Sequence, residues 1–156
     1  MTDYGVQHDI IRIERTYPAS PARVFGAWAD PAARERWFVQ EDGWVCEYRQ
    51  DFRVGGRESG RLVPPAGTAY HNETVFHDIV PNRRIVFAYS MARGDERISA
   101  SLATVELAPV AAGTRLLFTE QIALLDGRDQ AADREAGWRD LLAKLATELD
   151  RTTTAT

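Results

Sequence analysis

Glu120 is the residue whose type and spacing point most directly to chemistry. It follows Leu116 and Phe118 at intervals of two, so on a strand it shares their inward face. A buried carboxylate is costly unless it is paired. Three hypotheses stay open: an ion pair with the inward-facing Arg15, a polar anchor for a ligand, or a general acid or base. Pairing or anchoring is favoured, because no partner nucleophile or second acid is evident. We therefore assign no catalytic residue.

A metal site is the second chemical hypothesis. His71 and Glu73 lie two residues apart and share a strand face, and His77 follows closely. That face is opposite to Tyr70 and Phe76, which we expect to point inward, and a zinc site would need further converging ligands. The pattern favours solvated polar side chains, so we expect no metal and no cofactor.

Aromatic side chains form the third pattern, because they gather on the strand faces that should point at the C-terminal helix. Several of them are tyrosines, whose hydroxyls need partners when buried, and Asn72 and Ser101 share these faces. A solid core is the alternative, but a dry core rarely accepts many polar groups without partners. A cavity is therefore favoured. The candidate ligand-binding residues are Trp37, Phe38, Trp44, Tyr48, Tyr70, Asn72, Phe76, Phe87, Tyr89, Ser101, Phe118, Glu120, Trp138, Leu142 and Leu145.

Start and turn signals predict the elements that position these residues. Ser20-Pro21 and Asp30-Pro31 each place an N-cap before a proline at the first helical position, which predicts two short helices. The expected strands are 10–17, 44–52, 58–63, 70–76, 85–91, 97–107 and 114–122, at hairpin spacings. Residues 129–149 have helical periodicity, with an apolar stripe of Trp138, Leu141, Leu142, Leu145 and Leu149. The fold class is therefore α+β, with a curved antiparallel sheet of about seven strands and a long C-terminal helix.

Composition limits the classes of function. The chain has 156 residues, 44% of them apolar and 27% charged, which predicts one globular domain over 1–151 and a frayed tail over 152–156. A net charge of −4 argues against nucleic-acid binding. No apolar run approaches the length of a membrane span, and no signal peptide is evident. Cys46, the only cysteine, cannot form an internal disulfide, so we expect a cytoplasmic protein.

Short motifs follow one another along nearly the whole chain. They are IERTY at 13–17, SPARVF at 20–25, DP at 30–31 with WF at 37–38, DFRVGG at 51–56, DIVP at 78–81 with RIVF at 84–87, GTRL at 113–116 and GW at 137–138. Their order and spacing resemble the SRPBCC/START-like superfamily, and within it the family of homologues of the activator of heat-shock-protein-90 ATPase. The resemblance implies the helix-grip fold of the birch-pollen allergen. The superfamily includes lipid carriers, polyketide cyclases and hormone receptors.

The leading functional hypothesis is non-catalytic binding of a small, mostly apolar molecule between the sheet and the C-terminal helix. One alternative is a cyclase or hydratase that uses Glu120 as acid or base. Another is a chaperone-accessory module that binds protein through an outward apolar face of Ile98, Ala100 and Leu102, a face that could equally serve a homodimer. Gly137 inside the helix predicts either a close approach of a strand or ligand, or simple tolerance.

Overall fold

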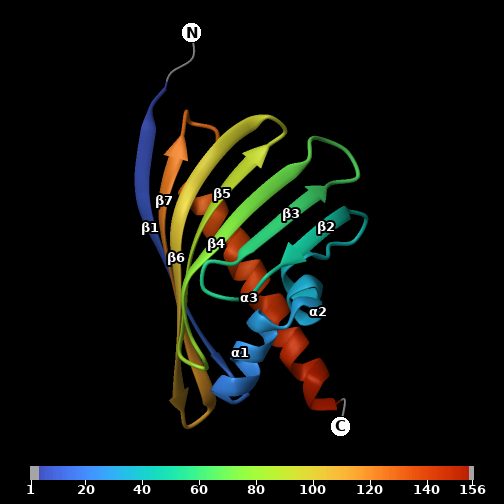
Figure 1. Ribbon diagram of the computed structural model, residues 1–156, viewed down its shortest axis with the longest axis vertical. Coiled ribbons are helices and arrows are strands. Elements are labelled where there is room, and N and C mark those ends of the chain that lie inside the picture. Colours follow the sequence, from blue (N-terminus) through green and yellow to red (C-terminus); the bar gives the residue numbers. More distant parts are fainter. Residues whose placement is uncertain (1–3, 155–156) are drawn as a thin grey trace.

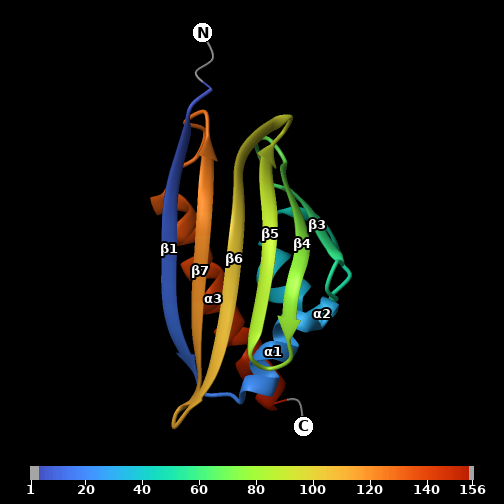
Figure 2. The same ribbon diagram turned by 60° about the vertical axis from the view of Figure 1, so that its left-hand side comes forward.

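A seven-stranded antiparallel sheet curves around a long helix, α3 (Figure 1). The computed structural model describes residues 4–154. The strand order is β1-β7-β6-β5-β4-β3-β2, so the first strand pairs with the last and the remaining strands form successive hairpins. Figure 2 shows α3 running behind the strands. The helix-grip architecture expected from the sequence is confirmed.

The bounds of the elements follow the turn signals closely. In chain order they are β1 (Val6–Tyr17), α1 (Pro21–Ala29), α2 (Pro31–Arg34), the π-helical turn η1 (Glu35–Val39), β2 (Val45–Gln50), β3 (Arg57–Val63), β4 (Tyr70–Val80), β5 (Arg84–Arg93), β6 (Glu96–Val110), β7 (Gly113–Leu125) and α3 (Ala131–Thr154). The last helix begins two residues later than expected and continues through 152–154. Residues 155 and 156 of the expected tail lie outside the described residues.

The two short helices begin at the expected caps. The Ser20 hydroxyl accepts a hydrogen bond from the backbone N–H of Arg23 at 3.2 Å, and the Asp30 carboxylate accepts one from Ala33 at 3.0 Å. Each side chain thereby satisfies a backbone donor that the first helical turn leaves free. The proline that follows each cap has no N–H, so it adds no backbone donor that would need an acceptor.

The chain leaves α2 through the π-helical turn η1. The backbone N–H of Gln40 donates to the carbonyl of Glu35 at 3.0 Å, which closes the wide turn. This turn buries Trp37, whose indole N–H donates to the carbonyl of Ala27 at 2.8 Å. The next side chain, Phe38, stays partly buried beside the core. The π-helical geometry therefore directs two successive aromatic side chains to different surroundings.

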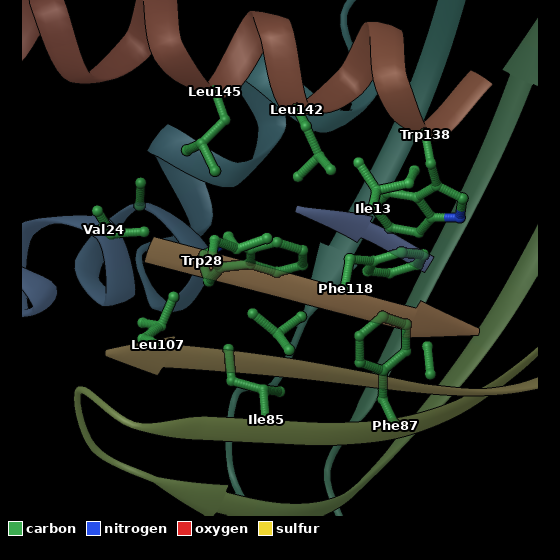
Figure 3. Close-up of a cluster of buried hydrophobic side chains, with 14 of the residues drawn as sticks. Ile13, Val24, Trp28, Ile85, Phe87, Leu107, Phe118, Trp138, Leu142 and Leu145 are labelled. Atoms are coloured by element: carbon green, nitrogen blue, oxygen red, sulfur yellow. The ribbon is translucent and has the colours of Figure 1, made fainter. Parts of the chain in front are cut away.

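The core lies between the inner face of the sheet and one face of α3. Figure 3 shows Ile13, Phe118 and Phe87 from the strands facing Trp138, Leu142 and Leu145 of the helix. Inward residues alternate along each strand because successive side chains point to opposite faces. The rings of Phe118 and Trp138 lie 4.3 Å apart, so sheet and helix are in direct contact here. Within residues 4–154, no helix is long and apolar enough to cross a membrane.

A β-bulge changes the expected alternation at the start of β6. The register between β5 and β6 shifts between Met91 and Ala92, which leaves Ile98 as the extra residue. Ile98 and Ser99 are consequently both buried. The expectation that Ile98 points outward is therefore wrong, whereas Leu102 is 40% exposed, and Ala100 is exposed with it.

Gly137 lies on α3 in open surroundings. A Cβ built on it would meet no atom within 4 Å, so no strand approaches it closely. We predict that Gly137→Ala stabilises the protein by about 1 kcal/mol, because glycine costs about that much relative to alanine inside a helix. Chemical denaturation measures the change. Ala136→Gly, at the preceding exposed position, is the matched control and should lower stability by a similar amount; a loss of stability in Gly137→Ala would contradict the open geometry.

Candidate ligand-binding cavity

A cavity of about 700 Å³ opens between the N-terminal half of α3, the turn η1 and one end of the sheet. Strands β3 to β6 supply its floor, through residues such as Leu62, Asn72, Met91 and Ile98. The other wall comes from α3. The cavity lies beside the packed core, so α3 and the core side chains cover one part of the sheet's inner face and leave another part open.

Two aromatic pairs line the cavity. Trp44 and Tyr70 stack with ring centroids 6.4 Å apart and planes 25° apart, on the side of β4. Phe38 and Trp138 lie 5.7 Å apart on the side of η1 and α3. Aromatic surfaces of this kind offer a large apolar contact area to a ligand. The four rings therefore offer apolar surface on two sides of the cavity, beside aliphatic side chains such as Leu62 and Met91.

The structure divides the fifteen candidate residues into two groups. Those that line the cavity are Phe38, Trp44, Tyr70, Asn72, Tyr89 and Trp138. Those that do not are Trp37, Tyr48, Phe76, Phe87, Ser101, Phe118, Glu120, Leu142 and Leu145. Most of the second group pack in the core. The sequence did not separate them from the cavity residues, because periodicity identifies the inward face of a strand but not where along the strand the helix makes contact. Contact with a ligand stays a prediction for the first group.

Sequence reasoning missed several cavity residues. Ile98 was hidden by the bulge, and Leu62 and Met91 were not singled out as lining residues. Arg134 is another of these residues: its side chain is only 10% exposed and lines the cavity. A signal was present, since Arg134 lies four residues before Trp138 and therefore on the same helical face.

Glu120 forms a buried ion pair with Arg134. The carboxylate has no exposed surface. One oxygen accepts from Arg134 at 3.2 Å and from the Ser101 hydroxyl at 2.7 Å, and the other accepts from the Tyr89 hydroxyl at 2.7 Å. The suggested pairing with Arg15 is wrong. In the β1–β7 register Ile11 is the residue opposite Glu120, and Arg15 lies four residues further along the strand.

The remaining donors of this cluster are also used. Arg134 donates to Ser99 and Asp129 at 2.7 Å each, and to the Tyr89 hydroxyl at 2.9 Å. The Trp138 indole donates to the same hydroxyl at 3.3 Å. Burial raises the pKa of Tyr89 well above its ordinary value, so the phenol stays protonated and keeps donating to the carboxylate. Both oxygens of Glu120 thus accept hydrogen bonds from within the protein.

A second buried ion pair, Arg34–Glu58, lies on the other side of the cavity. Arg34 Nε is 3.2 Å from Glu58 Oε2, each side chain is 1% exposed, and the Tyr48 hydroxyl donates to the same oxygen. The guanidinium lies 3.7 Å from the centroid of Phe38 and also stacks on Trp37. The stacked guanidinium holds Phe38 beside the cavity. The hydrogen bond to Glu58 directs the Tyr48 hydroxyl to the ion pair rather than into the cavity.

The described residues contain no group of three or more histidine, cysteine, aspartate or glutamate side chains that could hold a metal ion. Glu73 and His77 are exposed, and His71 is half-buried on the outer face of β4. Cys46 is partly buried, its thiol donates to the carbonyl of Val39, and burial raises its pKa. A raised pKa leaves less of the nucleophilic thiolate at neutral pH.

Comparison with known proteins decides the family. A family model described as activator of Hsp90 ATPase homolog 1-like protein matches residues 18–150, most of the chain. The chain belongs to this family. Among curated proteins, none matches it.

Several solved structures share this fold. A protein of Rhizobium leguminosarum has 39% sequence identity and a TM-score of 0.93, over 96% of this chain and 99% of its own. The Mll3558 protein of Rhizobium loti has 52% identity and a TM-score of 0.87, over 93% of this chain and 99% of its own. DynU16, from the dynemicin biosynthetic locus, has 23% identity and a TM-score of 0.67, over 91% of this chain and 47% of its own. At that identity, the match to DynU16 concerns the fold alone.

Removing the buried charge of Glu120 should be costly. We predict that Glu120→Gln lowers stability by about 3 kcal/mol, because Arg134 loses its fully buried counter-ion and keeps only the more exposed Asp129. Denaturant unfolding measures the change. Glu106→Gln, at an exposed position on the same sheet, should change stability by less than about 0.5 kcal/mol. Equal effects of the two substitutions would contradict the assigned role of the ion pair.

Alkaline pH should destabilise the fold through its buried tyrosines. Burial raises the pKa values of Tyr17, Tyr48 and Tyr89, so the folded protein retains protons that the unfolded chain releases above about pH 10. Stability is therefore unaffected by these groups below pH 10 and falls above it, by about 1.4 kcal/mol per pH unit for each tyrosine. Urea unfolding between pH 9 and pH 11 measures the slope. Tyr17→Phe should make it shallower, and an unchanged slope would be the contradicting result.

Proposed function

We propose that the protein binds a small, mostly apolar molecule in the cavity, without catalysing a reaction on it. The observation that supports this most strongly is the cavity of about 700 Å³ between α3 and the sheet, lined by Trp44, Tyr70, Phe38 and Trp138. Ligand sites usually have volumes of about 300–1,000 Å³, and combine apolar walls with a few polar groups. Membership of the family is consistent with ligand binding.

Charged groups surround the cavity but are largely compensated. Lys144 pairs with Glu41, and Arg128 lies 3.6 Å from Asp126. Arg134 is held by Glu120 and Asp129. Arg93, Asp133 and Asp140 also line the cavity, and with them the lining carries four basic and four acidic side chains. The balance of charge favours a neutral ligand.

The enzymatic alternative has less support. Glu120 does not line the cavity, and its two oxygens already accept hydrogen bonds from Arg134, Tyr89 and Ser101. A general acid or base must come within hydrogen-bond reach of the substrate. Glu120 is better explained as the structural member of an ion pair.

Binding to another protein stays a secondary hypothesis. The outward Leu102 and Ala100 are the positions where a chaperone or a second copy of the chain would contact the sheet. They form a small apolar surface that favours no particular partner. We also propose that the protein acts in the cytoplasm.

A neutral fluorescent probe tests the proposal. We predict that N-phenyl-1-naphthylamine binds the wild-type protein with a blue-shifted, enhanced emission. Met91→Trp should weaken binding at least tenfold, because the added indole would occupy space at the cavity floor. Ser90→Trp adds the same group to the adjacent position, which points to the outer face of β5, and should leave binding unchanged. Absence of binding to wild type, or equal losses in the two variants, would overturn the proposal.

A further inference from the structure

Asn72 has a buried carboxamide beside the cavity with no partner among the described residues. Its side chain lies on the inner face of β4, lines the cavity and is 5% exposed. No hydrogen bond joins the carboxamide to another side chain or backbone group in the described part of the chain. The amide is not among the fully enclosed polar atoms that lack a partner, so it stays accessible from the cavity, where a ligand can supply the hydrogen bond that a largely buried amide needs. This amide is therefore positioned to bond to something that enters the cavity.

The neighbouring strand leaves room for this side chain. Gly60 on β3 is the register partner of Asn72, and a Cβ on Gly60 would collide with Asn72 Oδ1. The carboxamide thus lies over a position that carries no side chain. The Nδ2 of the amide carries two N–H donors, and neither has a partner in the described part of the chain, so the amide can donate to a group that enters the cavity.

The other buried polar groups of the cavity wall are already bonded. The Tyr89 hydroxyl donates to Glu120 and accepts from both Arg134 and Trp138. The Trp138 indole N–H is used in that contact, and Arg134 is bound by Glu120 and Asp129. Three polar side chains of the cavity lining are buried, namely Asn72, Tyr89 and Trp138, and Asn72 is the one of the three for which the described chain supplies no hydrogen-bond partner. The less buried Arg134 keeps only its Nε–H, because its other donors are bonded.

We propose that the ligand is an uncharged molecule with a carbonyl group, and that the Asn72 amide donates a hydrogen bond to that carbonyl. This inference rests on the proposed function and specifies its ligand class. The compensated charges around the cavity disfavour an ionic head group, since Lys144 and Arg128 already have carboxylate partners. The apolar remainder of the molecule lies between the Trp44–Tyr70 and Phe38–Trp138 pairs.

Two probes of nearly equal shape test the inference. 2-Acetylnaphthalene carries a carbonyl where 2-isopropenylnaphthalene carries a methylene group, and both should quench the cavity tryptophans on binding. We expect Asn72→Leu to weaken binding of the ketone about tenfold and to leave the alkene unchanged or tighter, as for loss of one hydrogen bond in a buried site. Thr74→Val replaces another buried polar side chain on β4, outside the cavity, and should leave the ratio of the two affinities unchanged.

Gly60→Ala provides a second test that keeps the amide. The added methyl group should displace the Asn72 side chain, and the preference for the ketone should fall as it does in Asn72→Leu. Affinity for the alkene should change less than twofold, which shows that the cavity itself is intact.

The possible outcomes separate the two proposals. Failure of the wild-type protein to bind either probe would overturn the proposed function and this inference together. Binding of both probes with the same affinity ratio in wild type and Asn72→Leu would overturn the inference and leave ligand binding standing. A ratio that falls in both Asn72→Leu and Gly60→Ala, but not in Thr74→Val, would support it.

Discussion

Glu120 lies on the inner face of β7, next to the edge strand β1, with no exposed surface, and the position of helix α3 follows from this constraint. A carboxylate in such a place is stable only when cations and donors surround it. Arg134 is the cation, and it reaches Glu120 only when the start of α3 lies over β7. The hydroxyls of Tyr89 on β5 and Ser101 on β6 also donate to Glu120, so four elements, β5, β6, β7 and α3, meet at one ion pair.

The rest of the arrangement follows from where α3 is held. Its C-terminal half is tied by Arg36, whose guanidinium donates to Glu148 at 3.0 Å, and by the Tyr17 hydroxyl, which donates to the carbonyl of Leu142 at 2.9 Å. The Arg34–Glu58 pair holds η1 against β3. Helix and sheet touch through Phe118 and Trp138 but separate toward Trp44 and Tyr70, and the cavity occupies that space.

Much of the fold could be predicted from sequence because its signals are local. Caps at Ser20 and Asp30, and alternation such as Leu116, Phe118 and Glu120, depend on residues close together in the chain. The partner of Glu120 could not be predicted, because it depends on how α3 settles against distant strands. The bulge at Ile98 could not either, since one inserted residue changes which side chains face inward.

The sequence predicted which strand faces point inward, but not which part of those faces borders the cavity. Alternation placed Phe87 and Phe118 on the same inward faces as Tyr89 and Asn72, and all four do point inward. Which of them face α3 directly and which face open space depends on the curvature of the sheet and the tilt of the helix. Glycine is weak evidence in a strand, so the space that Gly60 provides for Asn72 became evident only in three dimensions.

The central claim is that the space between α3 and the sheet holds a small neutral molecule. A crystal structure of the protein soaked with N-phenyl-1-naphthylamine tests it most directly. The account predicts density for the probe between the Trp44–Tyr70 pair and Trp138, with the Glu120–Arg134 pair unchanged. Density for the probe only on the outer face of the sheet, or aromatic side chains filling the cavity, would contradict it.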